Sequence, residues 1–360
     1  MKVLHVVGAR PNYMKTAPIM AVMGRYPADF DQVLVHTGQH YDYNMSKVFF
    51  EDLEMPPPND FLNVGSGSHA EQTARTILAF EPVLLKHRPD WVMVVGDVNS
   101  TLACALVCAK LGVPVAHVEA GLRSRDWTMP EEVNRVLTDQ MAGLLFTPSR
   151  DGDANLLAEG IASERIRFVG NVMMDTLVRM LPKAQGRGLL RGLDLKGQRY
   201  IVVTLHRPSN VDDPAVLREI IQALYEVSHH WPVVFPVHPR SRQRIDQLCL
   251  SANGAAVRWL EPLGYLDFLS LVRSAGLVIT DSGGLQEETT YLGIPCLTVR
   301  PNTERPITVE IGTNRLVASQ REALVAAVEA VIHGDVKPGQ VPEGWDGRAA
   351  ERIVGVMSDE

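Results

Sequence analysis

Short apolar runs recur along the chain, and each ends in glycine or a polar residue before a helical segment begins. The runs at 3–7, 91–95, 277–280 and 294–299 are examples, and the last of these is the last strand that we expect. The expected helices include one from about residue 14 to 24 and one from about 69 to 87. Strands this uniformly apolar are typical of parallel sheets that are covered by helices on both faces. The alternation therefore predicts an α/β protein with doubly wound parallel sheets.

The alternation runs twice. With 360 residues, the chain is long enough for two domains with substantial cores. The Gly/Arg-rich segment 185–197 resembles a passage between them. We expect an N-terminal domain at 1–170, a C-terminal domain at 171–339, and a last segment, 340–360, that returns to the first domain by analogy with two-domain chains of this type.

Composition narrows the function classes. The net charge is −7 without a basic run, which disfavours a broad nucleic-acid surface. No apolar run reaches the roughly 20 residues of a membrane helix, and the N-terminus lacks a signal-peptide layout. The four cysteines form no Cys-x-x-Cys pair. We expect a cytoplasmic, reduced protein with no membrane contact, disulfide or metal.

Carboxylates follow two expected strands of the first half. Asp97 comes after the run 91–95, and Glu119 after the run 113–118. Glu131 lies on the first turn of a helix that begins at Pro130, and Arg135 shares its face. Because α/β sheets bind ligands at the carboxyl ends of their strands, these groups are candidate site residues. The alternative is a strand-end carboxylate and a helix charge pair with structural roles only.

A glycine pair marks a second candidate site. Ser282, Gly283 and Gly284 precede a helix, where free N–H groups can bind phosphate, and Glu288 lies one turn on, where it could hold ribose hydroxyls. A structural Gly-Gly turn is the alternative. The three-glycine dinucleotide fingerprint is missing, so we expect no nicotinamide or flavin cofactor.

Further polar groups stand at strand ends in both halves. Arg10 and Lys15 add positive charge after the first strand, while His206 and His238 each end a strand of the second half. Either histidine alone could be structural, but two at equivalent strand ends favour a ligand role. Together these sites suggest a nucleotide-sugar cleft between two Rossmann-like domains, as in the GT-B type of fold.

Short motifs along nearly the whole chain carry a resemblance. They are Gly8-Ala-Arg-Pro-Asn-Tyr-Met-Lys15, Thr37-Gly-Gln-His40, Gly96-Asp97, His117-Val-Glu-Ala-Gly-Leu-Arg123, Pro130-Glu-Glu-Val-Asn-Arg135, His206-Arg207, Pro236-Val-His-Pro239, Asp281-Ser-Gly-Gly-Leu-Gln-Glu-Glu288 and Thr303-Glu-Arg-Pro306. Their types and order resemble those of the non-hydrolysing UDP-N-acetylglucosamine 2-epimerases.

The resemblance implies reversible conversion of UDP-N-acetylglucosamine (UDP-GlcNAc) to UDP-N-acetylmannosamine (UDP-ManNAc) by a cytoplasmic homodimer without a cofactor. In such enzymes UDP is eliminated to leave 2-acetamidoglucal and is then added back. The catalytic residues that it implies are Asp97, Glu119, Glu131 and His206. The substrate-binding residues that it implies are Arg10, Lys15, Arg135, His238, Phe268, Ser282, Gly283, Gly284, Glu288 and Arg305.

The reaction has physical requirements that agree with this set. The C2 hydrogen has no carbonyl beside it, so the C1–O bond must stretch ahead of proton loss, with oxocarbenium character as in glycoside cleavage. Donors that stabilise the departing diphosphate contribute ~3 kcal/mol each. Exchange at both faces of C2 needs two acid/base groups, and which carboxylate is acid and which is base stays open.

The chain also departs from the family pattern. Ala9 and Asn12 replace Thr and Glu in the first motif, segment 208–210 reads Pro-Ser-Asn, and Ile307 stands where Glu is frequent. The sugar therefore stays open, with UDP-2,3-diacetamido sugars as alternatives. So do a hydrolysing 2-epimerase that releases ManNAc and UDP, a GT-B glycosyltransferase, and a non-catalytic UDP-sugar-binding module.

Some bacterial members bind a second UDP-GlcNAc as an activator through Gln-His-Arg-Gln and a nearby Arg. Here Gln39-His40 is followed by Tyr41-Asp42, so the motif is only half present. Gln39, His40 and Arg75 are the residues that such an allosteric site would use.

Overall fold

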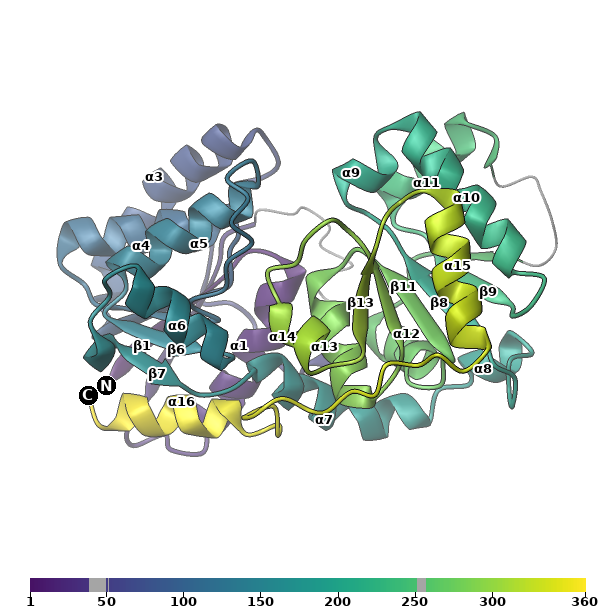
Figure 1. Cartoon of the computed structure of the whole chain (residues 1–360). Coiled ribbons are helices and arrows are strands. Elements are labelled where there is room, and N and C mark those ends of the chain that lie inside the picture. Colours follow the sequence, from purple (N-terminus) through teal and green to yellow (C-terminus); the bar gives the residue numbers. More distant parts are fainter. Residues whose placement is uncertain (39–49, 51, 251–256) are drawn as a thin grey trace. The chain divides into compact units, whose positions relative to one another are not determined.

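The chain divides into two compact units in the computed structural model, which describes residues 1–38, 50, 52–250 and 257–360 apart from the side chains of Arg10 and Arg240. Unit 1 comprises Met1–Arg179 and Glu343–Glu360, and unit 2 comprises Met180–Pro342. Each unit has its own parallel β-sheet (Figure 1). The prediction of two doubly wound α/β domains is confirmed.

Unit 1 contains a seven-stranded sheet in the order β3-β2-β1-β4-β5-β6-β7, and all its strand pairs are parallel. Its strands are β1 (Lys2–Val7), β2 (Asp31–His36), β3 (Asp60–Phe61), β4 (Trp91–Val95), β5 (Val115–Val118), β6 (Leu144–Thr147) and β7 (Ile166–Phe168). The neighbours β4 and β5 are the strands that precede Asp97 and Glu119, so these two carboxylates follow adjacent strands.

The helices of unit 1 cover both faces of this sheet. They are α1 (Arg10–Met23), α3 (His69–His87), α4 (Asn99–Leu111), α5 (Pro130–Met141), α6 (Arg150–Ala158), α7 (Val172–Gln185), which crosses into unit 2, and α16 (Ala349–Ser358), with a short 3-10 helix at Ser163–Arg165. One buried core joins α1 and α16 to the sheet, and another joins α3 and α4.

Local sequence explains where these helices begin. Ser68 and Glu71 form a capping box at the start of α3, which spans the residues expected for it. By contrast, α1 begins at Arg10 and not near Met14 as expected. Proline is tolerated in the first helical turn, so Pro11 did not delay the start.

Unit 2 contains a six-stranded parallel sheet in the order β10-β9-β8-β11-β12-β13. Its strands are β8 (Ile201–Thr204), β9 (Val233–Pro236), β10 (Val257–Leu260), β11 (Leu277–Thr280), β12 (Cys296–Val299) and β13 (Asn314–Val317). Its helices are α8 (Leu189–Gly192), α9 (Pro208–Val211), α10 (Pro214–Val227), α11 (Pro239–Gln247), α12 (Tyr265–Val272), α13 (Gly283–Leu292), α14 (Pro306–Glu310) and α15 (Arg321–Ile332).

The last residues of the chain belong to unit 1. The indole N–H of Trp345 donates to the carbonyl of Pro148 at 3.0 Å. The backbone N–H groups of Ala349 and Ala350, at the start of α16, donate to the carboxylate of Asp175. Ile353 and Met357 then pack into the core that α1 shares. The C-terminal helix thus completes the first domain (Figure 1, yellow).

Two findings concern membrane-spanning helices and metal sites. Within the part of the chain that the structure describes, no helix is long and apolar enough to cross a membrane. In those same ranges no cluster of three or more His, Cys, Asp or Glu side chains could hold a metal ion.

Stability of the protein is expected to fall between pH 7.5 and pH 5 because of His36. Its Nδ1 accepts the N–H of Gly38 at 2.9 Å, its ring stacks on Phe61, and burial lowers its pKa to about 4. Below pH 6.5 the unfolded chain takes up a proton that the folded chain refuses, so acidification removes stability, by about 2 kcal/mol at pH 5.

The variant His36→Asn keeps an acceptor for Gly38 but cannot be protonated, and we expect it to lose that part of the pH dependence. Urea unfolding at pH 7.5 and pH 5.0 measures it. His5 and Asp175, whose pKa values burial shifts to about 4 and about 6, titrate equally in both proteins. Replacing the exposed His229 by Asn is the control, and an unchanged slope in His36→Asn would contradict the prediction.

Candidate active site

Glu119 lies immediately after β5 in a strained and buried position. Its φ angle is +71°, which non-glycine residues rarely adopt and which costs on the order of 1–3 kcal/mol. Its carboxylate forms an ion pair with Lys15 of α1, and both side chains are 7% exposed. Such a strained backbone conformation persists only where surrounding contacts hold it in place. The residues next to Glu119 are therefore expected to make strong contacts.

Gly121 is one of those neighbours, and no other residue fits there. Its φ angle is +82°, and a Cβ atom would lie 2.5 Å from the carbonyl oxygen of Gly152. The chain after Glu119 is therefore packed directly against the backbone of α6.

Asp139, fully buried on α5, holds the loop on both sides of Glu119. It accepts the N–H of Gly121 at 3.1 Å and pairs with Arg123 Nη2 at 2.8 Å. It also lies 2.6 Å from His117 Nδ1, whose other nitrogen donates to the carbonyl of Gly96 at 2.8 Å. Burial alone would raise the pKa of Asp139, but His117 and Arg123 outweigh it and hold the pKa below the usual value.

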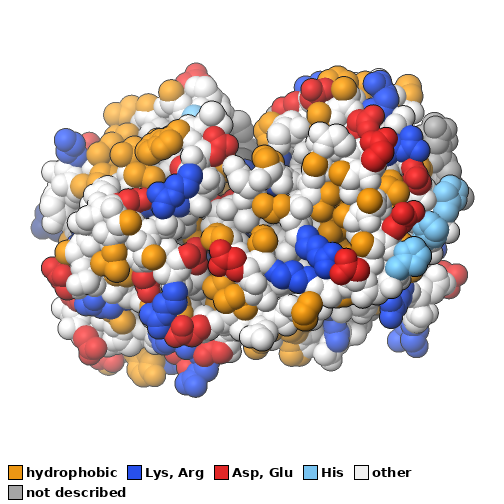
Figure 2. Space-filling model, viewed as in Figure 1, with side chains coloured by type: hydrophobic (Ala, Val, Ile, Leu, Met, Phe, Trp, Pro, Cys, Tyr) orange, Lys and Arg blue, Asp and Glu red, His pale blue; other side chains and the backbone are white. Residues whose placement is uncertain are grey.

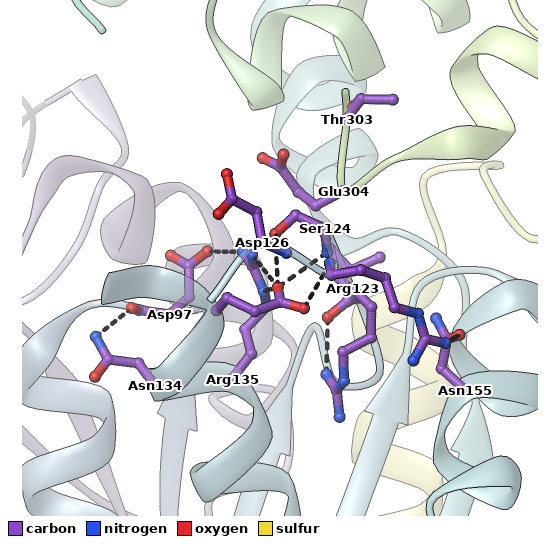
Figure 3. Close-up of polar contacts among 12 residues, drawn as sticks. Asp97, Arg123, Ser124, Asp126, Asn134, Arg135, Asn155, Thr303 and Glu304 are labelled. Carbon is purple, nitrogen blue, oxygen red and sulfur yellow. Dashed lines mark hydrogen bonds and ion pairs between the residues drawn. The ribbon is translucent and has the colours of Figure 1, made fainter. Parts of the chain in front are cut away.

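Asp97, which follows Gly96, is held by the same helix. Its carboxylate lies 2.5 Å from Arg135 Nη1, and its carbonyl accepts from the amide of Asn134 at 2.8 Å. Figure 3 shows Asn134 and Arg135 reaching Asp97 from α5. A single helix thus fixes the backbone at the ends of β4 and β5.

Glu132 is a residue that sequence reasoning missed. It is buried, it lies 2.7 Å from Arg135 Nη2, and it accepts the N–H groups of Ser124 at 2.9 Å and Arg125 at 2.8 Å. Burial would raise the pKa of Glu132, but these hydrogen bonds and Arg135 lower it overall. Glu131, the neighbouring candidate, is half-buried on the first turn of α5.

The second unit places His206 and His238 after the adjacent strands β8 and β9, with ring centroids 5.9 Å apart. His206 Nδ1 lies 3.0 Å from Asp281, a fully buried carboxylate at the end of β11. Asp281 also accepts the backbone N–H groups of His206 and Arg207. The sequence pointed to His206 but not to this support.

The helix after Ser282 begins earlier than expected, because both glycines belong to the first turn of α13 and Ser282 is its N-cap. A Cβ atom on Gly283 would lie 2.4 Å from Arg305 Nη1, so glycine lets the helix start approach that guanidinium. Glu288, on the second turn, is buried and accepts from the Tyr265 hydroxyl at 3.0 Å. Gly284 lies on the first turn.

Arg305 is itself anchored by carboxylates. Its guanidinium lies 2.8 Å from Glu287 and 2.5 Å from Glu304, and all three side chains are buried. Phe268, another predicted contact, is half-buried on α12. The second unit therefore brings Gly283 and Arg305 together at one helix start.

Four predicted site residues remain, namely Arg10, Gln39, His40 and Arg75. The side chain of Arg10 and the whole of Gln39 and His40 lie outside the described residues. Arg75, on α3, donates to the carbonyl of Ser66 at 3.2 Å and lies 3.7 Å from the carboxylate of Glu71. These contacts are local to the start of α3.

Comparison with known proteins decides the family. The family model described as UDP-N-acetylglucosamine 2-epimerase matches residues 25–358. The chain belongs to this family. The resemblance in the motifs is thereby confirmed, and by its family the protein is an epimerase, which is a kind of isomerase.

Relatives in the epimerase family cover nearly the whole chain. The UDP-N-acetylglucosamine 2-epimerase of Methanocaldococcus jannaschii is 42% identical over 366 residues, which are 99% of each protein. The UDP-2,3-diacetamido-2,3-dideoxy-D-glucuronate 2-epimerase of Pseudomonas aeruginosa is 41% identical over 98% of each. The crystal structure of the M. jannaschii epimerase in complex with UDP-GlcNAc and UDP superimposes with a TM-score of 0.90, covering 100% of both chains at 41% identity.

The epimerase residues that sequence reasoning missed are mainly buried carboxylates. Asp139 and Arg135 are four residues apart on α5, and Glu132 and Arg135 three apart, so helical spacing could have suggested that they share a face. Spacing alone does not show whether Glu131 or Glu132 turns inward. Asp281 opens the glycine motif, but only the structure pairs it with His206.

Replacing Asp139 by Asn is expected to cost about 3 kcal/mol of stability. The amide would place an N–H group against the buried donors that now share the carboxylate. It would also remove one of the two carboxylates that pair with the buried guanidinium of Arg123. Urea unfolding measures the loss, with Asp29→Asn, an exposed carboxyl of the same unit, as the control. A midpoint within error of the wild-type value would show that the network does not hold the loop.

Proposed function

We propose that the protein catalyses the reversible C2 epimerisation of UDP-GlcNAc to UDP-ManNAc without hydrolysing the sugar from UDP. The main support is Glu119, a carboxylate held in a strained backbone beside Lys15 at the end of β5, next to the strand end that carries Asp97. Costly geometry of this kind clusters at sites of chemistry. Membership of the epimerase family and the likeness to a structure with bound UDP-GlcNAc give the reaction.

In this proposal unit 2 binds the UDP moiety. The N–H groups at the start of α13, from Ser282 to Gly284, bind the diphosphate, and Arg305 beside Gly283 adds positive charge. Glu288 holds the ribose hydroxyls. Further contacts in unit 2 are assigned to His238 and Phe268. Contacts in unit 1 are assigned to Arg10, Lys15 and Arg135.

Four residues act on the sugar in this proposal. The C1–O bond breaks with its electron pair leaving on UDP, and a base takes the C2 proton as the C1–C2 double bond of 2-acetamidoglucal forms. UDP oxygen then adds back to C1 while C2 receives a proton on the opposite face. Asp97, Glu119, Glu131 and His206 provide the two acid/base groups and stabilise positive charge on the ring.

A different UDP-sugar is a candidate substrate for the same epimerase reaction. The P. aeruginosa relative that is 41% identical acts, by its name, on a UDP-2,3-diacetamido sugar acid. The P. aeruginosa relative and the M. jannaschii crystal structure are each 41% identical to this chain. A related UDP-2-acetamido or UDP-2,3-diacetamido sugar is therefore the second candidate substrate.

Incubation with a panel of UDP-sugars in deuterated water tests the proposal. We expect UDP-GlcNAc to give UDP-ManNAc with deuterium at C2 in both epimers, observed by NMR. Free ManNAc as the main stable product would instead indicate a hydrolysing enzyme. Sugar transfer that appears only with an added acceptor would indicate a glycosyltransferase, and binding without turnover a UDP-sugar-binding module.

Glu131→Gln is expected to lower kcat by roughly 100-fold or more while UDP binds about normally, because an acid/base group contributes that much and the diphosphate binds elsewhere. Initial rates and UDP titration calorimetry measure the two properties. Glu322→Gln, an exposed carboxyl on α15, is the control. Unchanged turnover in Glu131→Gln would remove this residue from the mechanism.

The proposal includes a homodimer that works in the cytoplasm, in the supply of activated sugars for polysaccharide synthesis. Support for the dimer comes from apolar side chains that unit 1 exposes over α3, α4 and α5, which pack side by side (Figure 2). On α3, Leu78 is 72% exposed and Leu85 56%, and Leu137 of α5 is also exposed. Apolar surface gathered in this way marks interaction sites.

The double substitution Leu78→Glu with Leu85→Glu is expected to convert the protein to monomers, because it places charge in an apolar interface. Light scattering after size-exclusion chromatography gives the mass. The double substitution Val336→Glu with Val341→Glu, at exposed apolar residues of unit 2, is the control. A wild-type protein that is already monomeric would contradict the dimer.

A further inference from the structure

Asp281 makes more contacts with the His206 segment than a loop cap requires. Its two oxygens lie 3.1 and 3.0 Å from the backbone nitrogen of His206, and one accepts the N–H of Arg207 at 2.9 Å. That same oxygen accepts from the Asn210 amide at 3.1 Å. The other oxygen lies 3.0 Å from Nδ1 of the His206 ring. Backbone and ring of His206 are thus held by one carboxylate.

The hydrogen-bond donors around Asp281 indicate which atoms of Asp281 and His206 carry protons. Backbone and amide N–H groups can only donate, so they require acceptor oxygens on Asp281. Burial alone would raise its pKa, but the hydrogen bond and charge of His206, with the Arg207 N–H and Asn210, hold the pKa below the usual value. The carboxylate is therefore ionised and His206 Nδ1 carries a hydrogen. Nε2 is then the nitrogen left for proton exchange.

The two side chains differ in access to solvent. Asp281 is fully buried, whereas the side chain of His206 is 41% exposed. The strands that carry them are neighbours, and the hydroxyls of Thr204 and Thr280 at their ends are 2.7 Å apart. The strand ends are thus tied together next to the pair, so Asp281 and His206 are positioned by the sheet and not by a free loop.

Other groups also face this region. The His238 ring lies 5.9 Å from the His206 ring, on the end of β9. The guanidinium of Arg207, the next residue, lies 3.9 Å from the carboxylate of Glu304. Of these groups, Asp281 is the one that bonds to the imidazole of His206 itself. Charge changes at Asp281 therefore act on His206 more directly than changes at its other neighbours.

We propose that Asp281 is a positioning residue for His206, holding Nδ1–H so that Nε2 is the atom that exchanges a proton during epimerisation. This inference rests on the proposed function, in which His206 acts on the sugar. Asp281 touches no reacting atom. When Nε2 takes up a proton, the imidazolium is stabilised by the carboxylate behind it, and the proton leaves from the same nitrogen in the reverse step.

A purely structural role for Asp281 would have different consequences. If it only fixed the turn at residues 206–207, its loss would damage the protein equally whether or not residue 206 is a histidine. A double-mutant cycle separates the two roles, because it measures the coupling between two side chains directly.

The experiment compares wild type, Asp281→Asn, His206→Asn and the double variant in the full-length protein, with kcat, KM and the pH profile for UDP-GlcNAc. We expect Asp281→Asn to lower kcat by about 100-fold in the wild-type background, with a smaller change in KM, because its amide opposes the Nδ1–H tautomer. We expect it to lower kcat less than about threefold in the His206→Asn background. The histidine limb of the pH profile should move about one unit toward acid, since a negative neighbour is lost.

An equal loss of kcat in both backgrounds, or an unmoved pH limb, overturns the positioning role and leaves the proposed epimerase function intact. Near wild-type turnover in His206→Asn instead removes His206 from the proposed mechanism, and with it this inference. Asp246→Asn, at an exposed carboxyl of unit 2, is the matched control and should behave as wild type.

A measurement on the unaltered protein keeps the proposal testable if Asp281→Asn does not fold. Nitrogen-15 NMR of labelled histidines reports which ring nitrogen carries hydrogen, and the spectrum of His206→Asn identifies the His206 signals. We expect the Nδ1–H form of the neutral ring at high pH. The Nε2–H form would overturn the proposal.

Discussion

Asp139 binds three groups that flank the candidate catalytic carboxylates, and it does so without access to water. Its partners are His117, Gly121 and Arg123, on both sides of Glu119, and His117 passes the contact on to Gly96, before Asp97. Charges buried this deeply are stable only with well-placed partners, and removing one partner is costly. The positions of Asp97 and Glu119 are therefore coupled through a single side chain.

The same arrangement recurs in the second unit with different residues. Asp281, at the end of β11, is as fully buried as Asp139 and holds His206 at the end of the neighbouring strand. In each unit a carboxylate with no proposed chemical role fixes the backbone that carries a residue with one. Parallel sheets bring the carboxyl ends of adjacent strands to one edge, which makes such bracing between strand ends possible.

Much of the fold followed from the sequence because its central strands are short, apolar and flanked by clear helix signals. The helix at His69–His87 was predicted at both ends, since a capping box and the last-turn Lys86 and His87 delimit it. Strand β13 was missed. Its sequence, Asn314–Val317, is half polar, and as an edge strand it has no need of an apolar run on both faces.

Site residues that lie in recognisable sequence motifs could be predicted. Site residues whose orientation depends on how α5 packs against the sheet could not. Asp97, Glu119 and Glu131 stand out at strand ends or a helix start, whereas the inward orientation of Glu132 and the reach of Asp139 depend on how α5 rotates against the sheet. Helical periodicity narrows that rotation without fixing it, because Glu131 and Glu132 are adjacent. The choice among UDP-sugars depends on contacts to the sugar, which short motifs do not encode.

The position of α16 has a consequence for the synthesis of the protein. Ala349, Ile353 and Met357 fill a core that otherwise consists of residues before 180, so the core of the first domain stays incomplete until these residues have been translated. The second domain, Met180–Pro342, is continuous in sequence and has all its residues earlier. The domain that is translated first is thus the one that is completed last. Part of its apolar core stays uncovered until α16 has been synthesised.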